Sequence, residues 1–317
     1  MALQIPTQIE LDGQYRALRE HAGLLERDER RSILVSGAEA ADFLQGQLTN
    51  DVEALEPSQG AYAALLDRKG HMQADMRVLC TEQGFRIDTE DVAADAVVRH
   101  LSLYKVGRDV NVEEVTDSES ILSLIGPAAV EIALSGPLAP EHAQGEGQLD
   151  GASFIAVATE DGIDLIVAGA DAAALSAALL ARGAEAVSEE AAEIVRVEAG
   201  RPRFGREMTA ATIPQEAGIN DRAVNFTKGC YIGQETVARL HHRGKPNRHL
   251  RGLRLSAPAR DGDPVRLGER DLGLVGSAVV SPAHGPIALA ILRREAEPGA
   301  VVSVDDTTSA EVVELPF

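Results

Sequence analysis

The chain has 317 residues and a formal net charge of −20, with 50 acidic and 30 basic side chains. That length allows two or three domains, while so negative a charge opposes broad binding to nucleic acid or to an anionic membrane. Aromatic residues make up 3% of the chain and Trp is absent, which argues against a base-stacking platform for single-stranded nucleic acid. We therefore expect no direct DNA binding and no membrane association.

The start of the chain and its cysteines indicate a compartment. The opening "MALQIPTQIELDG" has neither a basic n-region nor an apolar h-region, so we expect no signal peptide. No apolar run is long enough to cross a bilayer. Two cysteines, Cys80 and Cys230, cannot build a disulfide framework. A cytoplasmic protein is the simplest interpretation.

Three segments share a local plan in which a strand-like apolar run is followed by a Gly or Ala turn and a helix-like run. Gly126-Pro127 ends the strand of the second segment, and Pro127 suits a first helical turn. In the third, Asp171 is a plausible N-cap and Gly183 a helix stop. Irregular spacing excludes a solenoid, and the pattern predicts an α+β fold with helices on mixed or antiparallel sheets. The segments are residues 32–44, 121–134 and 164–183.

The chain between and after these segments has its own pattern. Residues 62–89 alternate like strands joined by turns, 91–104 repeat apolar residues at helical spacing, 109–115 alternate like a strand, and 188–199 resemble a helix that ends at Gly200. After residue 249, short strands separated by Pro, Gly and Asp predict a separate all-β module, a barrel or a sandwich. Residues 241–249, "HHRGKPNRH", are interpreted as its linker.

Charge is spread unevenly along the chain. Residues 222–254 hold eight Lys or Arg and one acid, Glu235, which gives this segment +7 and the remainder −27. We call these residues the basic segment. A cationic stretch in an acidic protein favours a local anionic ligand over a broad polyanion surface, and the alternative is a solvated basic face.

The octapeptide "KGCYIGQE", residues 228–235, lies inside the basic segment. It lacks the GK[ST] ending of a phosphate loop. Cys230 as a catalytic thiol has physical support, because the nearby positive charge of Lys228 lowers a thiol pKa. The alternative is a small buried Cys packed at a tight turn, for which Gly229 and Gly233 supply conformational freedom. Cys80 sits in an apolar strand run and is expected in the core.

Metal binding is not expected. The cysteines are isolated, and the adjacent His241 and His242 would point to opposite faces of a strand. Two carboxylates are of greater interest: Asp75 follows a turn on a strand-like run, and Glu198 ends a helix before a glycine. Charged groups facing a core are rare unless they are paired or bind a ligand. The structural alternative is a pairing with an arginine, for which the candidates are Arg77, Arg196 and Arg201.

The octapeptide resembles the signature of the YgfZ family of folate-binding proteins, relatives of the aminomethyltransferase, or T-protein, of glycine cleavage. Segments similar to those of this family follow in order over most of the chain, at residues 43–55, 60–70, 121–129, 195–208 and 235–253. The resemblance implies an α+β, three-domain, T-protein-like ring architecture with a C-terminal β-barrel. The implied domains are an α+β domain of residues 1–49 plus 111–240, an inserted α+β domain of 50–110, and a barrel of 241–317.

The resemblance also implies a ligand, tetrahydrofolate, in a central channel. Glu198, in "RVEAG", matches the acid that hydrogen-bonds the pterin ring, and a carboxylate can accept two N–H bonds from an aminopyrimidine edge. Cys230 matches the signature thiol, and Asp75 is a second catalytic candidate. The basic segment would meet the anionic glutamate tail. The further positions expected to bind the cofactor are Tyr62, Lys228, Tyr231, Gln234 and Arg239.

One departure from the T-protein pattern bears on activity. T-proteins read roughly "GGxxDD" where this chain reads "GHMQAD", so Ala74 replaces one acid and Asp75 keeps the other. The resemblance thus favours a tetrahydrofolate-binding accessory protein that supports iron–sulfur enzymes and tRNA modification, with iron–sulfur client proteins as partners. The alternatives are a folate-dependent aminomethyltransferase and a non-catalytic folate-sensing module, and whether the protein is an enzyme stays open.

Overall fold

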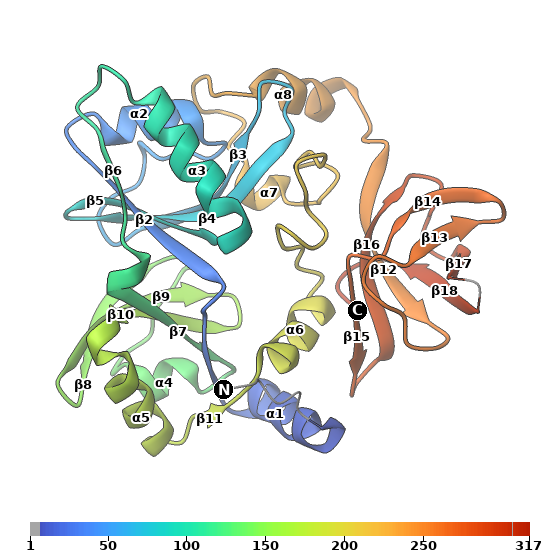
Figure 1. Ribbon diagram of the computed structural model, residues 1–317, viewed down its shortest axis with the longest axis horizontal. Coiled ribbons are helices and arrows are strands. Elements are labelled where there is room, and N and C mark those ends of the chain that lie inside the picture. The colour runs from blue at the N-terminus through green and yellow to red at the C-terminus, as the bar shows by residue number, and fades with distance from the viewer. Residues whose placement is uncertain (1–6, 306) are drawn as a thin grey trace. The chain divides into compact units, whose positions relative to one another are not determined.

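The computed structural model describes residues 7–305 and 307–317, and these residues form three β-sheets with accompanying helices (Figure 1). Residues 1–6, part of the segment considered above for a leader, lie outside the described residues. Within the described part of the chain, none of the helices is long and apolar enough to cross a membrane.

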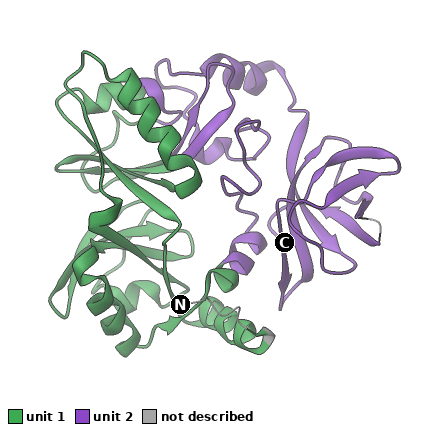
Figure 2. Cartoon of the chain, viewed as in Figure 1, with its two compact units in different colours: residues 1–45, 51–62, 76–192 green, residues 46–50, 63–75, 193–317 purple. Residues whose placement is uncertain are grey.

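The chain divides into two compact units, which Figure 2 shows in separate colours. Unit 1 comprises Met1–Gln45, Asp51–Tyr62 and Met76–Ala192, and unit 2 comprises Gly46–Asn50, Ala63–Asp75 and Glu193–Phe317. Each unit is therefore assembled from segments far apart in sequence. The ring architecture and the three-domain division implied by the resemblance stay predictions.

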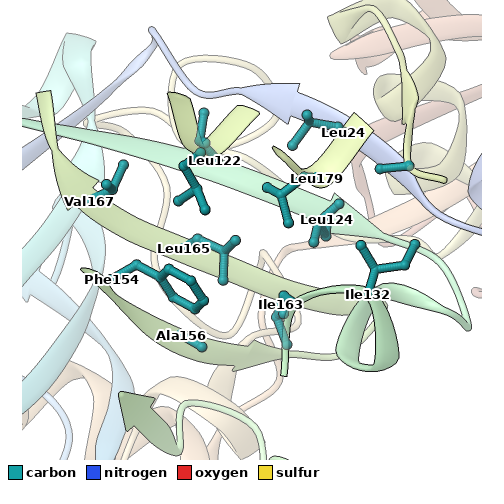
Figure 3. Packing of buried hydrophobic residues seen from close by; sticks show 14 of the residues in the cluster. Leu24, Leu122, Leu124, Ile132, Phe154, Ala156, Ile163, Leu165, Val167 and Leu179 are labelled. Carbon is teal, nitrogen blue, oxygen red and sulfur yellow. The ribbon is translucent and has the colours of Figure 1, made fainter. Parts of the chain in front are cut away.

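A six-stranded sheet in unit 1 carries the largest run of apolar strands. Its order is β11-β1-β7-β10-β9-β8, antiparallel except for the β1–β11 pair. One face packs Leu122, Leu124 and Leu165 against α5, as Figure 3 shows. The bounds are α1 (Gln8–Glu20), β1 (Gly23–Glu26), β7 (Glu119–Ile125), α4 (Ala129–Ala133), β8 (Gln144–Leu149), β9 (Ala152–Thr159), β10 (Gly162–Ala168), η2 (Gly169–Asp171), α5 (Ala172–Ala181) and β11 (Glu185–Ala186).

The other face of this sheet is also partly covered. Ile121, Val157 and Ile166 pack there with Leu79. Because side chains alternate between faces, coverage of both explains why β10 is buried almost throughout. The predicted strand–turn–helix segment at 164–183 is confirmed, and Gly183 follows the helix at φ 105°. Asp171 stands at the N-cap position of α5, but its side chain forms no capping hydrogen bond.

The five-stranded sheet has the order β3-β4-β5-β2-β6. Its helix α3 begins and ends where the spacing predicts, at 91–104, because Ala94, Val97 and Leu101 are fully buried. Its elements are β2 (Arg30–Ser36), α2 (Ala40–Gln47), β3 (Gly60–Leu66), β4 (Met72–Thr81), β5 (Gly84–Glu90), α3 (Asp91–Tyr104), β6 (Asn111–Glu114) and η1 (Thr116–Ser118).

A buried ion cluster in unit 1 joins β4 and β5 to β10. Arg77 pairs with Asp88 and Asp164, and Asp88 also pairs with Arg30. Burial opposes the charged forms, but the facing charges prevail, so the pKa of Arg77 is raised and that of Asp164 is lowered. The guanidinium considered above as a partner for a site carboxylate is thus engaged in this cluster.

The C-terminal module is an antiparallel sheet of order β14-β13-β17-β18-β12-β16-β15 around its own apolar core. Within the described residues its pairings do not return from β15 to β14, so the sheet is a half-barrel where the resemblance implied a β-barrel. The bounds are β12 (Arg248–Leu255), β13 (Pro264–Leu267), β14 (Arg270–Leu274), β15 (Ser277–Ser281), β16 (Gly285–Arg293), β17 (Val301–Val304) and β18 (Thr308–Val313).

The helices between residues 189 and 243 correct the predicted position of the linker before the C-terminal module. The predicted helix at 188–199 is α6 (Glu189–Glu198), followed by α7 (Asn220–Ala223) and α8 (Gln234–Arg243). The linker expected at 241–249 is wrong at both ends, because 241–243 close α8 and 248–249 begin β12. The buried side chain of Val237 gives α8 an apolar anchor. His241 and His242 therefore lie on a helix, not on a strand, with their rings edge to face at 4.9 Å.

Candidate functional site

The octapeptide 228–235 forms a loop that is fastened to unit 2 at its start. Asn225 donates its backbone N–H to Thr49 O at 3.0 Å. The Asn225 side-chain oxygen accepts the N–H groups of Thr227 and Lys228, at 2.8 and 3.0 Å. This is the Asx turn that an asparagine stabilises through its short polar side chain. The loop thus enters the octapeptide with a fixed direction.

Lys228 is buried and holds the loop to the segment 48–50. Its Nζ donates to Leu48 O and to Asn50 O, each at 2.7 Å, and the residue is only 9% exposed. The Nζ also lies 5.2 Å from the ring centroid of Tyr231. Two carbonyl dipoles and an aromatic face therefore replace water around this ammonium. The assignment of Lys228 to cofactor binding stays a prediction, and these contacts are structural.

The segment 48–50 is matched to the loop by further polar contacts that sequence reasoning missed. The fully buried Thr49 donates its hydroxyl to Ala223 O at 2.6 Å and accepts from Ala64 N at 2.8 Å. Asn50 donates its side-chain amide to Arg222 O at 3.0 Å. The available signal was the polar pair "TN" after the apolar Leu48 that follows α2, since buried polar groups are nearly always hydrogen-bonded.

The two glycines of the octapeptide differ. Gly233 has φ 85° and precedes α8, and a Cβ there would lie 2.5 Å from Asp67 O and 2.8 Å from Leu66 Cβ. A Cβ on Gly229 would meet nothing within 4 Å, and its φ is not positive. The expectation of a glycine-dependent tight turn is confirmed at Gly233 and wrong at Gly229, where open space surrounds the backbone.

The cysteine and the tyrosine beside it have opposite exposures. Cys230 is exposed, so the alternative of a small buried Cys is wrong, whereas Cys80 is buried as expected and burial raises its pKa. Tyr231 is buried, and burial raises its pKa to about 12. Gln234 opens α8 and Arg239 is exposed on it. The loop thus exposes the Cys230 thiol between two buried residues, Lys228 and Tyr231.

Asp75 lies on β4, whose start is ordered by a second turn. Asp67 accepts the N–H groups of Lys69 and His71 at 2.8 and 2.9 Å; burial alone would raise its pKa, but these bonds lower it. Strand alternation then places Ala74 in the core, with no exposed surface, and the half-buried Asp75 on the other face. An acid at position 74 would face the core.

Glu198 ends α6 and is 3% exposed. Its Oε1 accepts the Ser281 hydroxyl at 2.5 Å, and its carbonyl accepts Phe317 N at 3.1 Å. The Ser281 oxygen in turn accepts the N–H groups of Ala283 and His284, at 3.0 and 2.9 Å. The turn after β15 therefore orients the carboxylate through one hydroxyl, a partner that the sequence did not reveal.

A second ion cluster is centred on Arg196, two residues before Glu198 on α6. Arg196 pairs with Glu193 and Glu207 and donates to Ser277 Oγ at 2.6 Å. Burial opposes these charges, yet the pairing raises the pKa of Arg196 and lowers that of Glu193. The cluster fixes the end of α6 against the C-terminal sheet.

The basic segment is split between two environments. Lys228 is buried, whereas five other cations are exposed and form no ion pair within the described residues: Arg239, Arg243, Lys245, Arg248 and Arg254. Tyr62, the remaining predicted cofactor residue, is half-buried and belongs to unit 1, so the structure does not place it beside the others.

Comparisons with known proteins agree with this architecture. The fold is that of the glycine cleavage aminomethyltransferase T from Bartonella henselae, a solved structure with TM-score 0.87 and 24% identity that covers 99% of this chain and 91% of that one. The family model "GCVT N-terminal domain" matches residues 6–228. The chain therefore belongs to the GCVT N-terminal domain family.

Curated relatives match over nearly the whole chain. An aminomethyltransferase of Corynebacterium aurimucosum is 30% identical over 100% of this chain and 91% of its own length. One from Saccharopolyspora erythraea is 30% identical over 96% and 89%, and one from Rubrobacter xylanophilus is 29% identical over 97% and 86%. These findings support the T-protein superfamily and leave the finer YgfZ assignment a prediction.

Proposed function

We propose that this protein binds a reduced folate, tetrahydrofolate, and acts on it as an aminomethyltransferase-like transferase. Membership of the GCVT N-terminal domain family and relatives named aminomethyltransferase support the proposal. The observation that carries it is Glu198, a carboxylate buried at a helix end and oriented by Ser281. A buried carboxylate is costly unless it meets donors, and a pterin's aminopyrimidine edge offers two.

Asp75 is the proposed catalytic aspartate of this reaction. Its strand is anchored at its start, where Met72 N donates to Thr212 O at 2.8 Å. A carboxylate on a fixed strand can orient a bound one-carbon donor, which is how an enzyme gains rate from positioning. In this proposal Glu198 holds the pterin and Asp75 orients the reacting group.

A second candidate is the accessory role first suggested by the octapeptide, with iron–sulfur client proteins and tRNA modification downstream. Two observations favour it. Cys230 is exposed on a loop that Lys228 anchors by donating hydrogen bonds to Leu48 O and Asn50 O. Ala74 stands where the T-protein pattern has an acid, and its position is fully buried. Folate binding without turnover is the behaviour expected of this candidate.

Calorimetry with tetrahydrofolate tests the binding that both candidates share. We expect Glu198→Gln to weaken binding at least tenfold, because the amide repels one of the two N–H donors. Glu235→Gln, an exposed carboxylate on α8, is the matched control and should bind as the wild type does. Absence of binding to the wild-type protein would contradict both candidates.

A coupled glycine-cleavage assay then separates the two. Turnover that Asp75→Asn reduces by orders of magnitude supports the transferase. Folate binding without turnover supports the accessory role, and Cys230→Ala then distinguishes a thiol-dependent function from a folate-sensing module. A Cys230→Ala variant that retains cellular function would favour the module.

A further inference from the structure

A hollow of about 700 Å³ lies in unit 1, on the face of the six-stranded sheet opposite to α5. This volume is within the range of about 300–1,000 Å³ usual for small-molecule sites. All of its lining residues belong to unit 1, and none is among the residues predicted above to bind folate. The hollow is therefore a separate candidate site.

The floor of the hollow is apolar and its rim is polar. Ile155 and Ile166 are register partners on β9 and β10 and form the floor. Ser153, two residues before Ile155, is exposed on the same face, and Glu146 of β8 lies opposite Ile155. A ligand with an apolar body would cover the two isoleucines and leave the rim to polar groups.

One end of the hollow carries two fixed, opposite charges. Arg86 reaches from β5 and pairs through Nη1 with Glu119 Oε2 on β7. Arg86 is 9% exposed, and its Nε has no hydrogen-bond partner among the described residues. A guanidinium has five N–H donors, so its pairing with one carboxylate oxygen leaves donors unused. A buried donor without a partner destabilises the fold, and an acceptor on a ligand in the hollow would relieve that cost.

We propose that this hollow binds a free α-amino acid with an apolar side chain. The amino acid carboxylate would pair with Arg86 and its ammonium with Glu119, because two opposite charges side by side complement a zwitterion. The side chain would lie on Ile155 and Ile166. A ligand that lacks either charge would leave one member of the Arg86–Glu119 pair without its new partner, which is how a site built on polar contacts rejects analogues.

Three probes of equal ring size test the assignment on the full-length protein. L-Phenylalanine, 3-phenylpropanoate and 2-phenylethylamine are titrated by calorimetry and by saturation-transfer NMR. We expect L-phenylalanine to bind at least tenfold more tightly than either of the probes with one charge. Equal binding of 2-phenylethylamine or of 3-phenylpropanoate, or absence of binding by all three, would overturn the proposal.

Variants locate the binding. Ser153→Phe places a ring in the hollow without touching the ion pair and should abolish L-phenylalanine binding with an unchanged melting temperature. Glu119→Gln should weaken binding at least tenfold, and Glu146→Gln, the same change on the rim, should leave it within twofold. Retention of full affinity by a folded Ser153→Phe protein would show that the amino acid binds elsewhere and would refute the site, whether or not Glu119→Gln is stable.

Discussion

The two parts of the basic segment both carry positive charge, but the lysine of the first part is buried and the cations of the second part are exposed. In residues 222–233, Lys228 is buried against two backbone carbonyls and the loop is fastened through Thr49 and Asn50. In residues 234–248, Arg239 and its neighbouring cations are exposed. A count of charges along the chain therefore does not distinguish cations that stabilise the fold from exposed cations that can bind a ligand. The first part should control stability and the second should not.

The largest loss of stability is expected for a substitution at Gly233, in the first part of the basic segment. Gly233→Ala forces a positive φ on a residue with a Cβ and drives that Cβ toward Asp67 O, so we expect a loss of about 4 kcal/mol in the free energy of unfolding. Gly229→Ala is the control inside the same octapeptide and should stay within about 0.5 kcal/mol. Urea unfolding monitored by circular dichroism measures both, and equal losses would show that the tight turn is not the cause.

Lys228→Met should come next, at about 3 kcal/mol. Methionine keeps the length of the side chain but removes the donors, which leaves Leu48 O and Asn50 O without this partner. Arg239→Met is the matched change of an exposed cation and should cost under about 0.5 kcal/mol. If the two variants unfold at the same urea concentration, the division of the basic segment into a structural and an exposed part is wrong.

Thr49→Val should cost about 2 kcal/mol. Valine has the shape of threonine, but it loses the bond to Ala223 O and the one from Ala64 N in a fully buried place. Thr227→Val, which removes an exposed hydroxyl that donates to Asn225 Oδ1 at 2.8 Å, is the control and should cost under about 0.5 kcal/mol. Proteolysis by trypsin should also reach the loop faster in Thr49→Val than in Thr227→Val, and indistinguishable rates would count against the role of Thr49.

The buried Tyr231 predicts that the stability of residues 222–233 depends on pH. Because burial raises its folded pKa to about 12 from the ordinary value of 10.0, the stability contributed by neutral Tyr231 is fully present below pH 10 and is lost as the pH rises toward 12. Absorbance at 295 nm should show that Tyr231→Phe removes a tyrosine phase that titrates well above pH 10. Removal of an early-titrating phase instead would show that the ring is accessible.

The smallest effect on stability is expected for charge reversal in the exposed part. Arg239→Glu combined with Lys245→Glu should change the free energy of unfolding by under about 0.5 kcal/mol. The same variant should weaken polyglutamylated tetrahydrofolate more than the monoglutamate, with a difference that salt screens. Equal weakening of both folates would remove this surface from tail recognition and would leave the proposed pterin contact at Glu198 untouched.

Local patterns predicted the elements that depend on local forces. The spacing of Ala94, Val97 and Leu101 located α3, and the glycine after α5 located its end, because both signals act within a few residues. The linker at 241–249 failed because its Gly, Pro and Asn do resemble a turn, while burial of Val237 extends α8 into it. Burial of one side chain is decided by the tertiary fold and is not a local signal.

The sequence by itself determined the mixed α and β class, the T-protein superfamily and the octapeptide that marks the loop, since these depend on residue types at fixed spacings, whereas the YgfZ assignment and the ring architecture stay predictions. Only the tertiary structure decided what each group does: that Lys228 holds carbonyls of residues 48 and 50, that Ser281 orients Glu198, and that Cys230 is exposed. The physical reason is distance along the chain. Partners that lie 83 to 180 residues apart meet only when strands and loops pack, and a hydrogen bond depends on that meeting within a few tenths of an ångström.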